Sequence, residues 1–241
     1  KSTAAEGWLR AENTGSAMVE TVQLQVGPKT IPALVAVPAG KGPFPGVVVT
    51  FHREGNDPFT RWLVDDLARN GFVAISPDHF HVLPPGKGPD VRRDYLSDEQ
   101  MASDLRAAAA WLKAQANVAK TKFGLLGHCM GGRTTWVGLQ CAPDLWACGG
   151  VWYGGGVFRR MGGLPPPAER FDLIKAPVAG FFGKDDKNPS PEDVATFDRM
   201  LTERGIRHEF HSYDNAAHAF MWIGSPKYRD RKSTRLNSSH V

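Results

Sequence analysis

Residues 122–136, KFGLLGHCMGGRTTW, decide how the rest of the chain is interpreted. An apolar run leads into the pattern Gly-x-Cys-x-Gly, centred on Cys129, and residues that suit a helix follow it. A strand, a sharp turn and a helix in this order are typical of a nucleophile elbow, here with cysteine in place of serine. Gly127 and Gly131 suit such a turn because they have no Cβ atom to collide with the neighbouring strand and helix. The stretch therefore predicts a nucleophilic cysteine on a strained turn, and the alternative is an inert thiol buried in a glycine-rich turn.

Strand and helix patterns alternate on both sides of this turn. Strands are predicted over residues 20–26, 30–37, 44–51, 72–78, 122–127, 148–155, 176–183 and 207–213, and helices over 57–71, 97–115, 131–141 and 190–205. This alternation predicts an α/β fold with a mostly parallel central sheet and helices on both faces. The Pro/Gly-rich segments 81–94 and 157–172 are predicted loops on the side where such sheets bind ligands. A sheet of this kind would normally have one more helix after the last strand, and the sequence does not supply it.

The composition is that of a globular protein. The chain has 241 residues, of which 41% are hydrophobic and 22% charged, and this length suits one α/β domain. We predict a single domain over residues 1–226, with its core at about 18–222. The basic segment 227–241 carries the whole net charge of +4 and resembles translated adapter sequence. We therefore predict that this segment is a non-native tail.

Charge and cysteine content restrict the function. Without the tail, acidic and basic side chains balance, so the sequence predicts neither a nucleic-acid partner nor a membrane partner. No apolar run approaches the roughly 20 residues that span a bilayer. The three cysteines form no Cys-x-x-Cys pair, which fits a reducing compartment. We predict a cytoplasmic protein that acts on a small molecule.

The residues that would complete a catalytic triad follow Cys129 in the order acid, then histidine, which is the order of this fold. GFFGKDDKNP places Asp185 and Asp186 just past a predicted buried strand, and SYDNAAHAF places His218 after the last one. Asp186 is the preferred acid and Asp185 the alternative. Cysteine would attack an ester carbonyl, histidine would handle the proton, and aspartate would hold the imidazole. The backbone N–H groups of Met130 and Arg53 are the predicted oxyanion hole.

Five segments then carry a family resemblance: GPFPGVVVTFHREG, GFVAISPDHF, FGLLGHCMGG, GKDDKNP and AAHAF. Over residues 20–222 the chain resembles the dienelactone hydrolase family, which comprises carboxymethylenebutenolidase-like α/β-hydrolases. The resemblance implies the α/β-hydrolase fold and a Cys-His-Asp triad that hydrolyses a lactone or ester without a metal or cofactor. A monomer or homodimer is expected.

The sequence departs from the family pattern at two places. The family commonly has a glutamate directly after the third strand, where this chain has His52, with Glu54 two residues on. An arginine that holds the substrate carboxylate is expected after the catalytic histidine, where this chain has Trp222. Arg92 and Arg93 are the candidates for a second substrate arginine. These departures predict a thiolate paired with an imidazolium, and they favour a less acidic ester.

Two alternatives accompany the hydrolase interpretation. A binding protein of the same fold that has lost catalysis would be consistent with the histidine at position 52, although the intact set of Cys129, His218 and aspartate favours the enzyme. His79 and His81, in PDHFH, could bind a metal at their spacing, but such residues are more often polar groups near a pocket. His79 is therefore a candidate for substrate binding, and we predict no metal.

Overall fold

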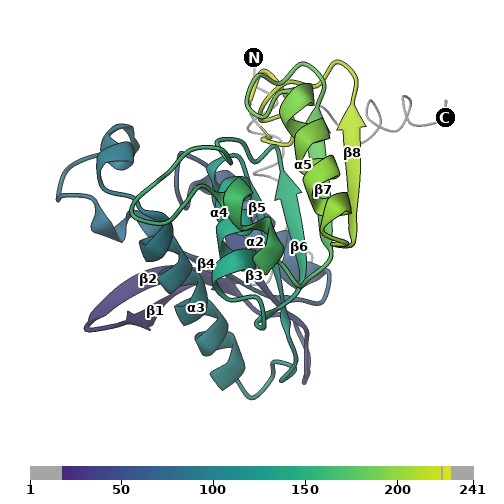
Figure 1. Cartoon of the computed structure of the whole chain (residues 1–241). Coiled ribbons are helices and arrows are strands. Elements are labelled where there is room, and N and C mark those ends of the chain that lie inside the picture. Colours follow the sequence, from purple (N-terminus) through teal and green to yellow (C-terminus); the bar gives the residue numbers. More distant parts are fainter. Residues whose placement is uncertain (1–17, 224, 229–241) are drawn as a thin grey trace, which may run out of the picture.

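A computed structural model describes residues 18–223 and 225–228. An eight-stranded sheet runs through this part of the chain in the order β1-β2-β4-β3-β5-β6-β7-β8 (Figure 1). The strands are β1 Glu20–Val26, β2 Lys29–Ala36, β3 Gly46–Thr50, β4 Val73–Pro77, β5 Phe123–His128, β6 Trp146–Trp152, β7 Val178–Gly183 and β8 His208–Tyr213. The pairs β1–β2 and β2–β4 are antiparallel, and the remaining pairs are parallel. The predicted mostly parallel sheet is confirmed.

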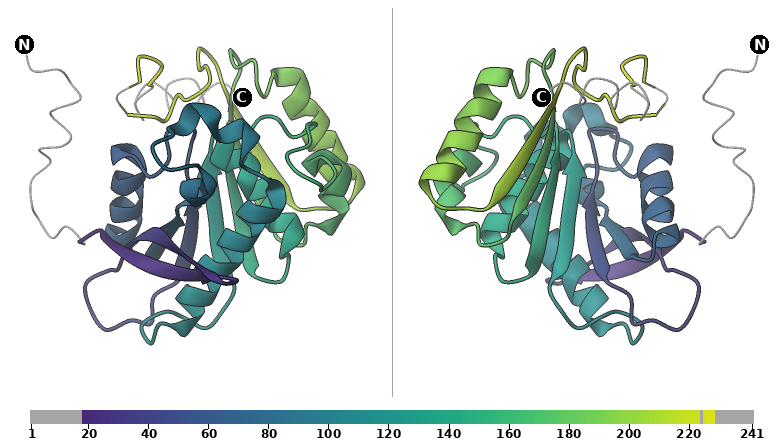
Figure 2. Two further views of the ribbon diagram at one scale, coloured as in Figure 1. Left: turned by 90° about the vertical axis from the view of Figure 1, so that its left-hand side faces the viewer. Right: turned by 90° about the vertical axis from the view of Figure 1, so that its right-hand side faces the viewer.

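Helices cover both faces of the sheet (Figure 2). They are α2 Pro58–Arg69, α3 Asp98–Ala114, α4 Met130–Cys141 and α5 Pro191–Glu203. α2 packs on one face, and the other three pack on the opposite face. Three of them begin at a polar side chain that caps free backbone N–H groups: Asp57 accepts from Thr60 N at 2.9 Å, Ser97 caps α3, and Ser190 forms a capping box.

Two apolar clusters lie on either side of the central strands. Val48, Leu105 and Trp136 belong to the larger cluster, under α3, α4 and α5. Val49 and Val64 belong to the smaller one, under α2. Every residue of β3 is buried, as its continuous apolar sequence predicts. The parallel strands are thus covered on both sides, and their carboxyl ends converge at one edge, where ligands bind in such folds.

The predicted loops contain short 3₁₀ helices. They are η1 His79–Val82, η2 Pro89–Asp94 and η3 Pro167–Leu173. Each turn closes through local i→i+3 hydrogen bonds, such as the bond from Leu83 N to Phe80 O at 2.9 Å, so hydrophobic periodicity does not reveal it. The loops themselves lie where they were predicted, after β4 and after β6.

The α2 face of the sheet is partly uncovered near β6 and β7. A hollow of about 500 Å³ there is lined by residues that include Leu126, Trp152 and Phe181. The indole and phenyl rings of Trp152 and Phe181 stack with centroids 4.7 Å apart. Between β8 and residue 228 the described residues form turns rather than the further helix that the fold would normally have. Residues 1–17 and most of the predicted tail, 229–241, lie outside the described residues.

Within residues 18–223 and 225–228, none of the helices combines the length and the apolar character needed to cross a bilayer.

Candidate active site

The predicted elbow joins β5 to α4, with Cys129 at its tip. The backbone of Cys129 has φ 59° and ψ −119°, a conformation that residues other than glycine rarely adopt. The neighbouring strand holds it there, because Cys129 N donates to Trp152 O at 3.0 Å. A Cβ atom on Gly131 would lie 1.9 Å from the carbonyl oxygen of Thr50. The turn therefore requires glycine at 131 and presents the thiol at the carboxyl edge of the sheet.

Three side chains from distant parts of the sequence meet at this tip. His218 Nε2 lies 3.0 Å from Cys129 Sγ, and His218 Nδ1 lies 2.8 Å from Asp186 Oδ2. Asp186 follows β7, and His218 lies in the loop after β8. The side chain of Asp186 is 2% exposed and that of His218 is 28% exposed. The imidazole therefore bridges a buried carboxylate and a thiol that faces a cavity.

Only one of the two candidate aspartates contacts the imidazole. Asp186 turns inward, and its second carboxylate oxygen accepts a hydrogen bond from Asn188 N at 2.9 Å. Asp185 is exposed and makes a backbone hydrogen bond to Ala216 O at 2.9 Å. The carboxylate of Asp186 is thus oriented from both sides, and Asp185 lies in solvent.

The electrostatics favour a charged pair of Cys129 and His218. Burial disfavours the thiolate, but the hydrogen bond and the charge of His218 outweigh burial, so the pKa of Cys129 is lowered. Burial likewise disfavours the imidazolium, but Asp186 and Cys129 raise the pKa of His218 to about 10. The two shifts act in the same direction, because each side chain stabilises the charged form of the other and so favours the thiolate–imidazolium pair.

Two backbone amides also point at the sulfur. The N–H groups of Met130 and Arg53 donate hydrogen bonds to Cys129 Sγ and help to lower its pKa. Met130 begins α4, where the free N–H groups and the helix dipole favour negative charge. Arg53 lies just beyond β3. These are the two amides predicted for the oxyanion hole, and they converge on one point from different strands.

A cavity of about 410 Å³ opens at Cys129 and His218. Its lining holds five arginines and no aspartate or glutamate; the arginines are Arg53, Arg92, Arg133, Arg159 and Arg160. Arg133 NH2 donates to Asp98 Oδ2 at 3.1 Å, and Arg53 Nε donates to Glu54 Oε1 at 2.9 Å. Arg159 and Arg160 are exposed, and no ion pair among the described residues holds either guanidinium. Arg159 and Arg160 therefore give the cavity lining an excess of positive charge.

Comparisons with known proteins show the family of this chain. The model of the dienelactone hydrolase family matches residues 31–240. The chain belongs to the dienelactone hydrolase family. A Methylorubrum extorquens protein assigned as a carboxymethylenebutenolidase is 32% identical over 219 residues, which cover 86% of this chain and 74% of that protein. A Synechocystis protein with the same assignment is 28% identical over 201 residues, covering 79% and 81% respectively.

The solved structures agree with this placement. A crystal structure from Klebsiella pneumoniae, assigned as a dienelactone hydrolase, has a TM-score of 0.80 and 25% identity, and the match covers 92% of this chain and 95% of that one. The α/β-hydrolase fold is therefore confirmed, and the chain is a hydrolase of the ester and lactone class.

The dienelactone hydrolase resemblance implied further site residues. The structure places some of them in the cavity lining and others outside it. Arg92 lines the cavity. His52, Glu54 and Trp222 do not line it. Glu54 instead pairs with the side chain of Arg53. The side chain of Arg93 lies outside the described residues.

His52 lies beneath the elbow rather than in the cavity. It is 2% exposed, and its Nε2 is 2.9 Å from Asp57 Oδ2. The ring of His52 contacts the ring of Trp222, with centroids 4.8 Å apart. Burial, followed by the charge of His52, lowers the pKa of the adjacent His128 to about 3, so His128 is neutral. These side chains pack the loops together and do not face the cavity.

The expectation that His79 contacts substrate is wrong. Its side chain is fully buried, with Nε2 3.2 Å from Thr50 Oγ1 and Nδ1 2.9 Å from Asp104 Oδ2. A group with no exposed surface and no place in the cavity lining cannot reach substrate. In the part of the chain that the structure describes, no group of three or more His, Cys, Asp or Glu side chains is arranged to hold a metal ion.

Sequence reasoning missed Arg133 and Asn188, both of which line the cavity. Arg133 lies one helical turn after Cys129, and Asn188 lies two residues after Asp186. Helical spacing from the nucleophile could have indicated the first. No local sequence pattern indicated Asn188. Its Oδ1 accepts a hydrogen bond from Gly156 N at 3.0 Å, a residue 32 positions earlier, and this contact places it at the cavity rim.

Proposed function

We propose that this dienelactone hydrolase family member cleaves a carboxylic ester or lactone with a triad of Cys129, His218 and Asp186. One observation carries the proposal: an unbroken contact chain from Asp186 through His218 to a thiol at the elbow, beside the cavity. The lowered pKa of Cys129 supports it, because the thiolate is the nucleophilic form.

In the acylation step, Cys129 Sγ attacks the carbonyl carbon, and the carbonyl oxygen becomes an oxyanion. The N–H groups of Met130 and Arg53 stabilise this charge. When the C–O bond breaks, the leaving alkoxide takes the proton from His218 Nε2 and a thioester remains on Cys129. In a lactone the alcohol stays tethered to the acyl group.

In the deacylation step, neutral His218 accepts a proton from water, and the hydroxide oxygen attacks the thioester carbon. The C–S bond breaks, the thiolate leaves, and the carboxylic acid is released. Asp186 holds the imidazole tautomer throughout and stabilises the imidazolium at both ends of the cycle.

The cavity supports an anionic substrate rather than the less acidic ester favoured by Trp222. Arg159 and Arg160 are exposed beside the thiol, and the cavity lining contains no acidic side chain. Arginine binds carboxylates through paired, charge-assisted hydrogen bonds. We therefore propose a substrate that carries a carboxylate in addition to its ester or lactone group.

Cys129→Ala tests the function. Hydrolysis of a dienelactone and of a p-nitrophenyl ester should fall at least about 10³-fold, because the attacking atom is removed. Cys148→Ala is the matched control, since Cys148 is exposed and lies outside the cavity. Equal activity of wild type and Cys129→Ala on either compound would refute the proposed nucleophile.

A further inference from the structure

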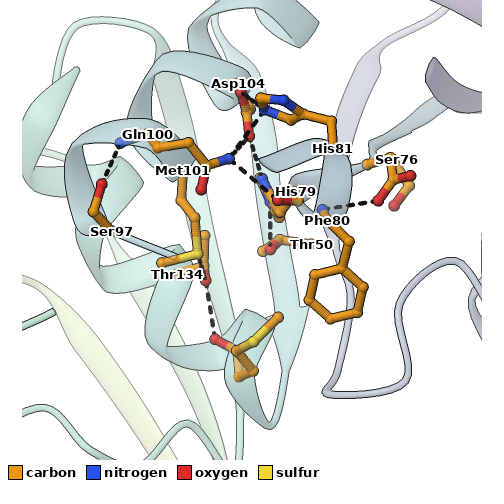
Figure 3. Close-up of polar contacts among 12 residues, drawn as sticks. Thr50, Ser76, His79, Phe80, His81, Ser97, Gln100, Met101, Asp104 and Thr134 are labelled. Carbon is orange, nitrogen blue, oxygen red and sulfur yellow. Dashed lines mark hydrogen bonds and ion pairs between the residues drawn. The ribbon is translucent and has the colours of Figure 1, made fainter. Parts of the chain in front are cut away.

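Asp104, His79 and Thr50 form a second series of carboxylate, imidazole and hydroxyl groups, separate from the one at Cys129 (Figure 3). Asp104 comes from α3, His79 from η1 and Thr50 from the end of β3. Asp104 Oδ2 lies 2.9 Å from His79 Nδ1, and His79 Nε2 lies 3.2 Å from Thr50 Oγ1. All three side chains are fully buried. These three side chains therefore have the same order of contacts as a catalytic triad, at a place that substrate cannot reach.

One hydrogen bond has a definite direction. A carboxylate only accepts, so His79 Nδ1 donates to Asp104, and the opposite ring nitrogen, Nε2, is left to pair with the Thr50 hydroxyl. The other carboxylate oxygen of Asp104 accepts from His81 Nε2 at 3.1 Å, and Gln100 also donates to this carboxylate. Both carboxylate oxygens of Asp104 and both ring nitrogens of His79 thus have a partner, and these contacts hold the His79 ring in one orientation.

Thr50 is where this network meets the catalytic machinery. It pairs with Gly127 in the register of β3 and β5. A Cβ atom on Gly127 would lie 2.5 Å from the Thr50 methyl carbon, and a Cβ atom on Gly131 would lie 1.9 Å from the Thr50 carbonyl oxygen. Thr50 therefore packs against both elbow glycines. The hydroxyl bond to His79 selects the χ1 rotamer in which the methyl group fits there.

From Thr50 the polypeptide backbone leads directly to Arg53, whose amide is the proposed oxyanion donor. Phe51 and His52 are buried, and Arg53 follows with its N–H directed at Cys129 Sγ. Only two residues separate the fixed end of β3 from this amide. The Phe51 ring also contacts the His79 ring, with centroids 5.2 Å apart. A shift of the Thr50 backbone would therefore move the Arg53 amide relative to the sulfur.

We propose that Asp104, His79 and Thr50 are positioning residues that hold the end of β3, and with it the Arg53 amide, against the elbow. The inference rests on the proposed function, in which this amide stabilises the oxyanion. It gives the buried histidine a role in transition-state geometry without any contact to substrate.

Thr50→Val tests the proposal, because valine keeps the shape of threonine and removes the hydroxyl. We expect kcat for the p-nitrophenyl ester to fall about tenfold with KM within about twofold, since a misplaced oxyanion donor weakens only transition-state binding. The pH midpoint for alkylation of Cys129 by iodoacetamide should also rise, because the Arg53 amide lowers the thiol pKa. Thr50→Ser keeps the hydroxyl and should restore both values.

His81→Gln is the matched control, since His81 touches the same carboxylate but does not contact Thr50. The kcat of this variant should stay within about twofold of wild type, and its alkylation midpoint within about 0.2 pH unit, because the bond between His79 and Thr50 remains. If Thr50→Val does not fold, Asp104→Asn replaces it, and its kcat should likewise fall and its alkylation midpoint rise.

A folded Thr50→Val protein with unchanged kcat and unchanged alkylation midpoint overturns the proposal, even if its thermal unfolding midpoint falls. If the wild type hydrolyses neither ester, the proposed function fails, and the alkylation midpoint alone decides the positioning role.

Discussion

Cys129 combines a strained backbone with three sources of positive potential. Its φ of 59° is maintained by the glycines around it, and His218, the Met130 amide and the Arg53 amide all face the sulfur. Burial alone would raise the pKa of the thiol. The lowered pKa is therefore a property of the assembled site and not of the cysteine in its local sequence.

The pH dependence of thiol alkylation follows from this balance. The inactivation rate with iodoacetamide should have its midpoint at a lower pH than that of an ordinary thiol, and it should fall as the pH drops through the lowered pKa of Cys129. Ester hydrolysis should fall again as the pH rises through about 10, where His218 loses the proton needed by the leaving group. Stopped assays from pH 5 to 11 would measure both limbs. A midpoint no lower than that of an ordinary thiol would contradict the ion pair.

The two adjacent aspartates allow a paired test. Asp186→Asn should lower kcat/KM by about 10² to 10⁴-fold, because the amide cannot hold the same imidazole tautomer or stabilise the imidazolium. Asp185→Asn should change it less than about twofold, since that side chain is exposed. Steady-state kinetics on one ester measure both. The reverse order of effects would make Asp185 the acid.

At the scale of elements, the elbow depends on how closely β3, β5 and α4 approach. Gly127 lies against the backbone of Gly131 and the methyl group of Thr50, and Gly131 lies against the backbone of Thr50. The sequence predicted this turn because Gly-x-Cys-x-Gly after an apolar run has few other uses. It could not predict that Thr50 packs against both glycines, since that contact depends on the register between β3 and β5.

Gly131→Ala should therefore disrupt the fold. The added methyl group would lie 1.9 Å from the Thr50 carbonyl oxygen and 2.7 Å from that of Phe51, and backbone atoms cannot move aside cheaply. We expect the free energy of unfolding to fall by about 3 kcal/mol or more, measured by urea denaturation. Gly88→Ala is the control, because no atom lies within 4 Å of its added Cβ. Equal stability of both variants would mean that the elbow is looser than described.

At the scale of the molecule, the sheet order decides what the cavity contains. The strands β5, β6, β7 and β8 lie side by side, so the loops after them meet at one edge. The loop after β6 brings Arg159 and Arg160 to the thiol, although about 30 residues of sequence separate them from it. The positive cavity is thus a product of topology, because residues 1–226 have no excess of basic side chains.

The double variant Arg159→Ala, Arg160→Ala should raise KM about tenfold for an ester that carries a carboxylate, since one charge-assisted interaction is lost. KM for an uncharged p-nitrophenyl ester should stay within about twofold. The effect of the double variant on KM for the charged ester should be smaller in 1 M salt, because both guanidiniums are exposed and salt screens their charge. Arg199→Ala, on α5 and outside the cavity, is the matched control. An equal effect on charged and uncharged esters would contradict carboxylate binding.

The sequence by itself determined the strand and helix order, the elbow, and the cysteine and histidine of the contact chain, because these depend on local periodicity, on glycines at fixed spacing and on the order of residues in this fold. It did not determine that His79 is buried against Thr50, that Asp186 rather than Asp185 reaches His218, or that Arg133 and Asn188 line the cavity. Only the tertiary structure decided these points. The direction in which a loop side chain turns depends on strands and helices that are distant in sequence, and no local pattern records their packing.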